Sequence, residues 1–485
     1  MSATNPKTEN LKADVVIVGA GAAGLSAAVA VRESGVKDVI VLESRKVPGG
    51  NSAVAGGIMG VETTLQELQS IHIGRDEIFK SVMDYTHWKA DAKLIRSMVD
   101  ISGDNVRWLE EMGVKFERLV PHYMNQVYHT YHATRGPERS GFAIIQALVK
   151  RCEELGVRIL CETPARKLLA EKNGTVNGVL AEANGKGLRI DAVSIIISTG
   201  GFAGNKELLK KLLPGYEEDV IHIEGIPHNG DGILMAEAVG AAIGGQITPE
   251  AEGPNYIGSG HVDFMAQLPY VIWVTKHGER FIQEDMTSIN EIANAMHWQT
   301  GKITYALFDE GIKNMVLKED FNLFSLHGMD NPTLHAGLEG ALKLQAEEGK
   351  IKVASSLKEI AAWIGADPQV LENTVNQYND SCERNHDALL VKDRRFLKPL
   401  STPPYYAVPC QIALLVTHGG IMIDHHLAVL DDDGNIIQGL YSAGDDTSGR
   451  MGDTYNIRIS GLSFCFAVGS GRIAGANAAK HVMGK

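Results

Sequence analysis

The sequence predicts a protein of the α/β class, on three observations. An apolar, β-rich run at residues 13–18 leads through a glycine-rich turn into a helix of small residues at 25–32. A second β-rich run occupies residues 38–42, and a third, at 195–202, is β-branched and ends in Thr-Gly-Gly-Phe. Strands that alternate with helices and end in glycine-rich turns are typical of a parallel sheet whose carboxyl ends face a ligand.

The composition is that of an ordinary globular protein. Of the 485 residues, 44% are hydrophobic and 22% charged, so the chain is long enough to bury roughly three quarters of its unfolded surface. This excludes the disordered and fibrous classes, and we expect two domains. The formal charge of −13 repels phosphate backbones and anionic membrane surfaces, so we expect no nucleic acid partner.

The cysteines and the uncharged stretches are those of a cytoplasmic protein without a membrane span. The five cysteines are widely spaced and form no Cys-x-x-Cys pair, which argues against a disulfide framework, an iron–sulfur cluster or attached haem. Residues 15–31 are uncharged and mostly small or apolar, but three glycines interrupt them and the segment before them lacks basic character. We interpret them as a buried strand and helix.

The first glycine-rich turn has the spacing of a nucleotide-binding motif. Gly19, Gly21 and Gly24 form Gly-x-Gly-x-x-Gly between a strand and a helix. The first glycine permits the turn, the second lets backbone approach a pyrophosphate, and the third lets the helix pack closely on the strand. Glu43 ends the next strand 19 residues after Gly24, where a carboxylate accepts hydrogen bonds from an adenosine ribose. These features predict an ADP-binding site, and a packing turn with a surface glutamate is the alternative.

A second glycine-rich loop distinguishes FAD from NAD. It runs as Val47-Pro48-Gly49-Gly50-Asn51-Ser52 and then Ala55-Gly56-Gly57, directly after the acidic strand. A loop with so few side chains lets backbone lie against a flat ring system, which a simple NAD-binding fold does not need. The sequence therefore predicts FAD.

With these motifs the chain resembles the fumarate reductase and 3-ketosteroid dehydrogenase superfamily of FAD flavoproteins, of the FAD-binding 2 type. The superfamily pattern is Gly-Ala-Gly-x-Ala-Gly, an acid, Gly-Gly-Asn and then Gly-Gly, and the similarity covers nearly the whole chain. It recurs at Ser198-Thr199-Gly200-Gly201-Phe202, Asn229-Gly230-Asp231-Gly232, His277-Gly278-Glu279-Arg280-Phe281, Thr417-His418-Gly419-Gly420, Gly439-Leu440-Tyr441-Ser442-Ala443-Gly444-Asp445 and Gly471-Arg472-Ile473-Ala474-Gly475.

The resemblance implies a Rossmann-like, glutathione-reductase-type FAD-binding domain with an inserted α+β capping domain. The FAD-binding domain is expected at residues 1–247 and 416–485, and the capping domain at 248–415. Members that attach FAD covalently use a histidine in the loop after the acidic strand; residues 43–60 contain none, so we expect noncovalent FAD. The expected cofactor-binding residues are Gly19, Ala20, Gly21, Ala23, Gly24, Glu43, Ser44, Gly50, Asn51, Ser52, Ala55, Gly56, Gly57, Ala165, Thr199, Gly200, Gly201, Asp231, Gly444, Asp445, Ser460 and Leu462.

The remaining pattern supports this division independently. Residues 341–349 and 356–365 have apolar residues at helical spacing, and residues 427–438 form an expected hairpin whose acidic run is a solvated turn rather than a metal site. After Gly461 a long helix of small and apolar residues extends to about residue 482. The resemblance places the N-terminus of this helix at the pyrimidine end of the flavin, where its dipole stabilises negative charge.

Two residues ahead of that helix are candidate substrate-binding groups. Arg458 matches an arginine that holds a substrate carboxylate in fumarate reductases, and a structural ion pair is the alternative. Tyr455 matches a tyrosine that hydrogen-bonds a substrate ketone in ketosteroid dehydrogenases, and a packed aromatic is the alternative. One segment thus carries features of both subfamilies.

The group that transfers the proton is missing from its family position. Seven residues beyond Phe281, fumarate reductases have an arginine and ketosteroid dehydrogenases a tyrosine, whereas this chain has Ser288. Serine has neither a suitable pKa nor a charge, although it could pass a proton through water. The family's histidines would fall at Val416 and Ala251 and are absent, so we do not expect classical fumarate reduction. His418 is the candidate replacement, because imidazole titrates near neutrality; a histidine bonded to backbone is the alternative.

A second cluster is rich in groups that bind oxygenated or aromatic molecules. These residues could line a pocket or form an ordinary surface loop, and a metal site is a third interpretation. The cluster consists of His122, Tyr123, Tyr128, His129, Tyr131, His132 and Arg135.

The leading hypothesis is an FAD enzyme that adds or removes hydrogen across a carbon–carbon bond next to a carbonyl or carboxylate. Hydride passes through flavin N5, Tyr455 and Arg458 hold the oxygen function, and His418 and Ser288 are the candidates for proton handling. A flavoprotein electron carrier without small-molecule chemistry is the alternative, and an amino-acid oxidase of the L-aspartate oxidase kind is a third. We expect a small-molecule substrate; the electron donor or acceptor stays open.

Overall fold

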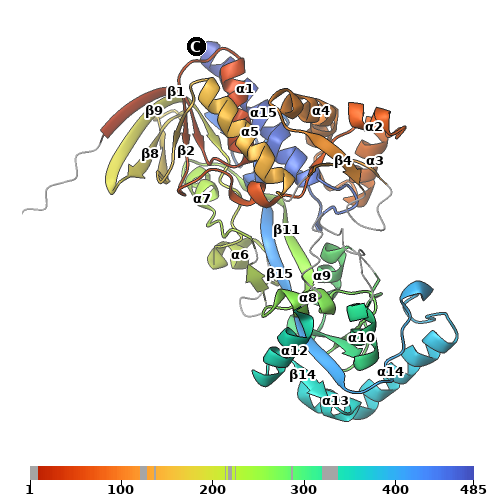
Figure 1. The fold of residues 1–485 in the computed structure, drawn as a ribbon. Helices are drawn as coiled ribbons and strands as arrows, with labels where there is room; N and C mark the ends of the chain where they lie inside the picture. The colour runs from red at the N-terminus through yellow and green to blue at the C-terminus, as the bar shows by residue number, and fades with distance from the viewer. Residues whose placement is uncertain are drawn as a thin grey trace, which may run out of the picture.

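Two lobes make up the molecule, joined by a pair of long strands (Figure 1). The computed structural model describes residues 9–120, 128–135, 138–213, 215–216, 221–223, 225–285, 288–318 and 337–484. Within these ranges the strands form three sheets. The upper lobe in Figure 1 contains both ends of the described chain, and the lower lobe is built from its middle.

The largest sheet forms the core of the upper lobe. Its main path runs β16–β17–β9–β1–β2–β6, and neighbours from β17 to β6 are parallel. The strands are β1 (Glu9–Val18), β2 (Val39–Leu42), β6 (Arg158–Leu160), β9 (Lys186–Ile197), β16 (Ala428–Leu430) and β17 (Ile436–Ser442), with β7 (Ala165–Ala170) and β8 (Val176–Ala183) attached beside β9. Val18 pairs with both Leu42 and Ile197 in register, so the segments that follow these three residues meet at one edge.

The predicted strands are present, and two of them begin earlier than predicted; the one expected at residues 13–18 begins at Glu9. The hairpin expected at residues 427–438 is confirmed, because β16 and β17 pair antiparallel. The strand expected at 195–202 begins nine residues earlier, at Lys186, and ends at Ile197. Its N-terminal half pairs with β8 as well as with β1, and this extra pairing extends it beyond the β-branched run.

Two helices that pack on this sheet approach each other unusually closely. α1 (Ala22–Glu33) and α15 (Leu462–Met483) lie side by side, as Figure 1 shows. A Cβ added at Gly471 would lie 2.1 Å from the Ala23 oxygen, and one at Gly475 would lie 2.5 Å from the Ala27 oxygen. Only glycine at these two positions lets the backbones of the helices touch. The long helix predicted after Gly461 is therefore confirmed, with a reason for its small residues.

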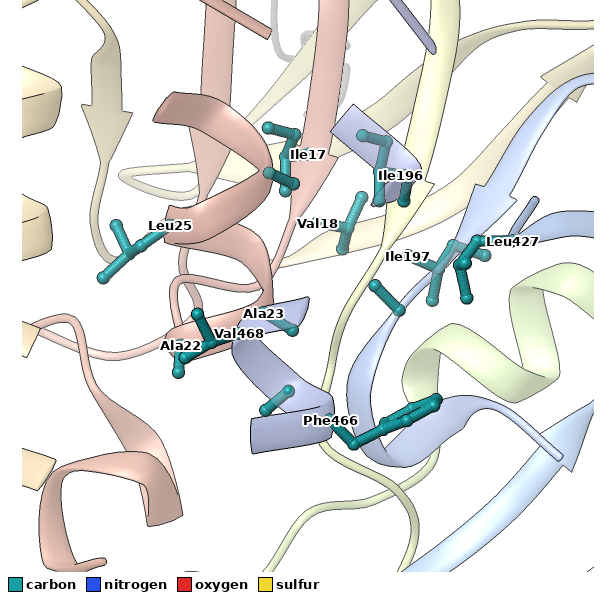
Figure 2. Close-up of a cluster of buried hydrophobic side chains, with 14 of the residues drawn as sticks. Ile17, Val18, Ala22, Ala23, Leu25, Ile196, Ile197, Leu427, Phe466 and Val468 are labelled. Atoms are coloured by element: carbon teal, nitrogen blue, oxygen red, sulfur yellow. The ribbon is translucent and has the colours of Figure 1, made fainter. Parts of the chain in front are cut away.

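The core between these helices and the sheet is aliphatic. Figure 2 shows Ile17, Val18, Ile196 and Ile197 of the sheet facing small residues at the start of α1 and Phe466 and Val468 of α15. All of these sheet side chains are at most 4% exposed. α5 (Ser140–Glu154) packs on α1 from the outside. This packing fixes the N-terminus of α1 relative to the strand ends.

A three-stranded sheet and three helices also belong to the upper lobe. The sheet has the order β3–β5–β4, with β3 (Ile58–Met59), β4 (Phe116–Val120) and β5 (Tyr131–Thr134). The helices are α2 (Thr64–Leu68), α3 (Arg75–Tyr85) and α4 (Ala92–Glu111). A Cβ at Gly461 would lie 2.4 Å from the Met59 nitrogen, so this sheet abuts the start of α15.

The lower lobe has its own sheet and its own core. β11 (Ile243–Asn255) and β15 (Tyr405–Ile421) pair antiparallel and pass from one lobe into the other. Around β15 lie β10 (Ile221–Ile223), β12 (Ile272–Thr275), β13 (Thr304–Asp309) and β14 (Lys352–Ala354), with α8 (Gly260–Ala266), α9 (Ile289–His297), α10 (Glu310–Lys318), α12 (Leu338–Glu347), α13 (Leu357–Ile364) and α14 (Pro368–Glu383) nearby. The helices α6 (Lys206–Leu212) and α7 (Asp231–Glu237) instead bury their apolar side chains in the core of the upper lobe. α12 and α13 confirm the helices predicted at 341–349 and 356–365.

The buried apolar side chains divide between the lobes at two points of the chain. One cluster includes residues up to Ala241 and resumes at Leu414, and the other runs from Ala251 to Ile412. This division supports the proposed domain boundaries after residues 247 and 415, which remain a proposal. Within the described ranges, no helix is both long enough and apolar enough to cross a membrane.

Candidate active site

A groove lies at the carboxyl ends of β1, β2 and β9, against the start of α1. It is lined by the predicted residues Gly19, Ala20, Gly21, Ala23, Glu43, Ser44, Gly50, Asn51, Ser52, Ala165, Thr199, Gly200, Asp231, Gly444 and Asp445. Unpredicted lining residues include Arg45, Pro164, Pro227, His228 and Met235. The groove thus collects motifs that are up to 426 positions apart, from Gly19 to Asp445.

The glycines of the first turn are required by close backbone contacts. Gly19 has φ +107°, and a Cβ there would lie 2.2 Å from the Ser198 oxygen. A Cβ at Gly24 would lie 1.9 Å from the Gly19 oxygen, so the helix approaches the turn only with glycine. α1 begins at Ala22, and the start of this helix faces the groove. A helix N-terminus beside a glycine turn suits the pyrophosphate of a dinucleotide.

Glu43 is held at the end of β2 by backbone amides. Its carboxylate accepts hydrogen bonds from the Ala20 nitrogen at 3.0 Å and from the Arg45 nitrogen at 2.8 Å. The side chain lines the groove and is only slightly exposed. A carboxylate fixed in this way is placed to receive the ribose hydroxyls of an adenosine.

The second glycine-rich loop is tied to both the helix and the segment before α7. Ser52 Oγ accepts a hydrogen bond from the Ala22 nitrogen at 3.1 Å. Asn51 bonds Ile226 in both directions, accepting from its nitrogen at 2.7 Å and donating to its oxygen at 3.3 Å. His228 then packs against the opposite wall, where a Cβ at Gly200 would lie 3.0 Å from its Nε2. The donor set, the bare turns and the fixed carboxylate fit FAD.

The Thr-Gly-Gly turn after β9 is held by a buried carboxylate that sequence reasoning did not single out. Asp446 accepts hydrogen bonds from the nitrogen and hydroxyl of Thr199 and, at 2.9 Å, from the Gly201 nitrogen. The side chain is fully buried. Burial is the largest effect and raises the pKa of Asp446 to about 6.

Several predicted cofactor residues are not among the residues that line the groove. They are Gly24, Ala55, Gly56, Gly57, Gly201, Ser460 and Leu462. Ala55 accepts a hydrogen bond from the Gly141 nitrogen at 2.8 Å, and a Cβ at Gly57 would lie 2.6 Å from the His132 oxygen. The Ala-Gly-Gly segment therefore packs on α5 and β5, and its role toward a cofactor stays a prediction.

A buried cluster of charged side chains adjoins the groove through Asp445. His418 Nε2 lies 2.9 Å from Glu250 Oε2, and His418 Nδ1 lies 3.1 Å from Asp445 Oδ1. Arg450 Nη2 donates to Asp445 Oδ1 at 2.5 Å and also contacts His418 Nδ1. His418 and Arg450 are 1% and 2% exposed. Burial tends to raise the pKa of Asp445, but the charges of Arg450 and His418 outweigh it and leave that pKa below its usual range.

Tyr455 joins this cluster. Its ring stacks on that of His418, with centroids 5.3 Å apart and planes 24° apart. Its hydroxyl accepts a hydrogen bond from Ser463 Oγ at 3.1 Å, in the first turn of α15. Burial first, and then the negative charge of Glu250, raise the pKa of Tyr455 well above its ordinary value. The phenol therefore stays protonated as a hydrogen-bond donor.

The other two catalytic candidates lie outside this contact network. Arg458 is exposed, and its guanidinium carbon lies 5.5 Å from the ring centre of Tyr85. Ser288 precedes α9, and its buried Oγ has no hydrogen-bond partner in the described part of the chain. Their predicted roles stay predictions, and the arginine that contacts His418 is Arg450.

The predicted histidine and tyrosine cluster is only partly described. His122 and Tyr123 lie outside the described residues. His132 is fully buried, with Nε2 2.7 Å from Thr63 Oγ1 and Nδ1 2.8 Å from the Thr130 oxygen. These contacts tie the short sheet to α2, which is a structural use of the side chain. No group of three or more histidine, cysteine or acidic side chains in the described ranges is arranged to hold a metal ion.

Sequence reasoning missed Glu250, Arg450 and His228. Arg450 stands in Ser-Gly-Arg-Met, where no motif marks it, and an arginine in a glycine-containing loop is ordinarily exposed. Glu250 directly precedes Ala251, where the resemblance leads one to look for a histidine, and that neighbourhood was the available signal. His228 directly precedes Asn229 of the Asn-Gly-Asp-Gly motif, and nothing in the sequence separates it from a surface histidine.

The comparisons with known proteins agree with this geometry. The family model described as FAD binding domain matches residues 14–460. The vinyl phenol reductase of Lactiplantibacillus plantarum is 28% identical over 487 residues, covering 96% of each chain. The open conformation of a flavocytochrome c3 fumarate reductase superposes with a TM-score of 0.73 at 26% identity, covering 98% of this chain and 79% of that one.

A third comparison bears on the fold alone. The 3-ketosteroid-Δ4-(5α)-dehydrogenase of Rhodococcus jostii superposes with a TM-score of 0.76 at 23% identity, covering 98% of this chain and 100% of that one. The same two-lobed architecture therefore carries both reductases and dehydrogenases.

Proposed function

The chain belongs to the FAD binding domain family, and from this premise we propose that it is an FAD-dependent oxidoreductase that reduces or forms a carbon–carbon double bond next to a carbonyl or other conjugating group of a small organic substrate. When bound, FAD supplies hydride exchange at its N5. The chain's own residues bind and orient the substrate, exclude water and handle one proton.

One observation carries this proposal: Asp445 lines the cofactor groove and also belongs to the His418 cluster. Groups that exchange protons or hydrogen-bond a substrate thus adjoin the wall of the redox site. We propose that Tyr455 faces the reacting double bond as the proton-donating group of the site and that Arg450 stabilises the negative charge that develops there. A role for Arg458 at the substrate remains a proposal, tested by Arg458→Ala.

The charges of the cluster bear on the kind of substrate. Glu250 and Asp445 contribute two carboxylates, whereas the single guanidinium of Arg450 is already paired with Asp445. A dicarboxylate would bring like charges together in a buried site, which is costly. We propose a substrate that is uncharged around its double bond, such as a vinyl phenol or an enone, and the similarity to a vinyl phenol reductase supports this.

Unpaired buried polar atoms near the cluster favour an enzyme over an electron carrier. Among the described residues these include Arg450 Nε, Asn456 Nδ2 and Asn290 Oδ1, each on a side chain at most 2% exposed. Asn456 follows Tyr455, and Asn290 donates to the Ala251 oxygen beside Glu250. Native proteins pair almost all buried polar atoms, so donors and acceptors left open here suit a polar small molecule.

The test is a reoxidation experiment on the reduced holoenzyme. Protein reduced by light under nitrogen is mixed in a stopped-flow instrument with 4-vinylphenol, fumarate or acrylate, and flavin absorbance is followed. We expect 4-vinylphenol to reoxidise the flavin fastest and to yield the ethyl phenol. Reoxidation by none of a wider alkene panel would favour the electron carrier, and peroxide formed with oxygen would favour an oxidase.

We also propose where the protein is located. All five cysteines are free, which supports the cytoplasmic location that we propose.

A further inference from the structure

The proposed reaction needs a proton, and the family position for its donor holds Ser288. The aliphatic hydroxyl of serine is a much weaker acid than a phenol or an imidazolium, so serine alone is a poor proton donor. Its Oγ also makes no hydrogen bond to any described residue that could resupply a proton. The proton must therefore come from another group near the groove.

The His418 cluster contains a continuous line of groups that hold and pass protons. It begins at His418, whose Nε2 is 2.9 Å from Glu250 Oε2. Glu250 in turn hydrogen-bonds the hydroxyl of Tyr455, and this hydroxyl also accepts a hydrogen bond from Ser463 Oγ at 3.1 Å. The backbone explains why Glu250 and His418 meet: β11 and β15 pair antiparallel, with Thr248 opposite His418 and Glu250 opposite Val416, so the two side chains lie two rungs apart on the same face of the ladder.

Only one group of this line reaches solvent to a useful extent. The side chain of Glu250 is 14% exposed, whereas that of His418 is 1% exposed. Tyr455 is 9% exposed and is the member proposed to face the substrate. A proton from water therefore has its entry at Glu250, between the storage group and the delivering group.

We propose that His418, Glu250 and Tyr455 form a proton relay that ends at the substrate and takes over the task left unfilled at Ser288. This inference rests on the proposed function. Tyr455 is the catalytic residue of the three, and Glu250 and His418 act through it. No part of this relay uses the arginine or tyrosine that the family places in the capping domain.

The step balances as a two-electron reduction. Tyr455 Oη releases its proton to the α carbon, so an O–H bond breaks as a C–H bond forms. The β carbon receives the hydride, and with it both electrons, from the reduced FAD of the proposed function. Glu250 passes the proton of His418 Nε2 to the phenolate oxygen, and a proton from water entering at Glu250 restores His418. In the direction of dehydrogenation each transfer reverses.

Two charged side chains border the relay formed by Glu250 on β11, His418 on β15 and Tyr455 in the loop before α15. They are Asp445, in the segment after β17, and Arg450, in the loop that follows it. Asp445 faces His418 Nδ1, opposite the nitrogen that faces Glu250. Asp445 and Arg450 both contact this far nitrogen and together orient the ring.

The test compares Glu250→Gln with Glu182→Gln, a surface glutamate of β8 that pairs with Arg166. Holoenzyme reduced by light is mixed with 4-vinylphenol in H2O and in D2O. We expect Glu250→Gln to slow reoxidation by about 100-fold or more, which is typical for loss of acid–base catalysis, and Glu182→Gln to leave it unchanged. The wild type should show a solvent isotope effect and deuterium at the α carbon.

Chemical rescue separates a relay from a structural carboxylate. Formate added to Glu250→Ala should restore reoxidation in proportion to its concentration, because it supplies a carboxyl group in the vacated space. Reoxidation of Glu250→Gln within twofold of wild type, or an Ala variant that formate does not rescue, would overturn the relay. A wild type that no alkene reoxidises would instead overturn the proposed function.

A readout without FAD covers the case in which the variants do not bind it. In the 15N-labelled wild-type apoprotein, the relay requires that His418 Nε2 carry a proton hydrogen-bonded to Glu250. A His418→Gln sample assigns the resonance. An Nε2 without a proton across pH 6–8 would contradict the relay independently of any activity.

Discussion

Replacing Asp446 by asparagine should remove a pH dependence of stability that the native fold contains. The carboxylate is fully buried behind the Thr-Gly-Gly turn and accepts hydrogen bonds from Thr199 and Gly201. Burial raises its pKa to about 6, against an ordinary value of 3.8. The native state therefore keeps a proton at pH values where the unfolded chain has lost it.

The sign and size of the effect follow from this difference. Below pH 3.8 both states are protonated, and above about pH 6 both are ionised, so the free energy of unfolding falls as the pH rises between these values. The gap corresponds to a loss of about 3 kcal/mol. Asparagine does not ionise, so the variant lacks this fall. The NH2 group of asparagine takes the place of the oxygen that accepts from the Thr199 nitrogen. Two donors then face each other, which destabilises the fold by about 1–3 kcal/mol at every pH.

Urea unfolding of the apoprotein, followed by tryptophan fluorescence between pH 4 and 8, measures both the pH-dependent loss of stability and the pH-independent cost of the amide. At pH 4 the variant should be about 1–3 kcal/mol less stable than wild type, and at pH 8 it should be equal to wild type or up to about 2 kcal/mol more stable. Asp191→Asn, at a surface carboxylate paired with Arg189, is the control and should follow wild type at each pH. A variant with the same fall between pH 4 and 7 as wild type would show that Asp446 is not the titrating group.

Three further predictions concern the cofactor, the helix pair and the substrate. Glu43→Gln removes the charge that receives two backbone amides, and FAD should bind about 10-fold or more weakly in a fluorescence titration. Gly471→Val places a side chain 2.1 Å from the Ala23 oxygen and should lower the melting temperature or prevent folding; Gly74→Ala, with open space, should not. Tyr455→Phe should keep FAD but slow reoxidation by 4-vinylphenol about 100-fold, and an unchanged rate would exclude Tyr455 from the site.

The cofactor half of the molecule was predictable because its requirements are local in sequence. Gly24 is required by its contact with the Gly19 oxygen in the same turn, and Glu43 follows from the length of one helix and one strand. The family model and the superposed structures confirm the FAD-binding fold. In each case the chemical requirement fixes the spacing of the residues along the chain, so the spacing alone reveals it.

The charged cluster was predictable only in part, because tertiary contacts decide which side chains are buried. Arg450 and Arg458 stand in one loop, and the sequence offers no pattern that distinguishes the arginine at 2% exposure from the exposed one. His418 was identified from its place before a Gly-Gly pair, but its partner Glu250 depends on the register of two strands distant in sequence. That register also shifts next to Glu250, which no local periodicity reports.

The paired strands β11 and β15 connect the lower lobe to the His418 cluster. β15 contributes residues from Tyr406 to Ile412 to the core of the lower lobe and then carries His418 into the upper one. β11 runs beside it in the opposite direction, with Thr248 opposite His418. Thr248 Oγ1 donates to the Gly452 oxygen at 2.6 Å, which fixes the loop between Arg450 and Tyr455 on the same strands. The histidine, the glutamate and the phenol therefore keep their spacing only while this two-stranded connection keeps its register, so a one-residue slip in β11 would separate Glu250 from both partners.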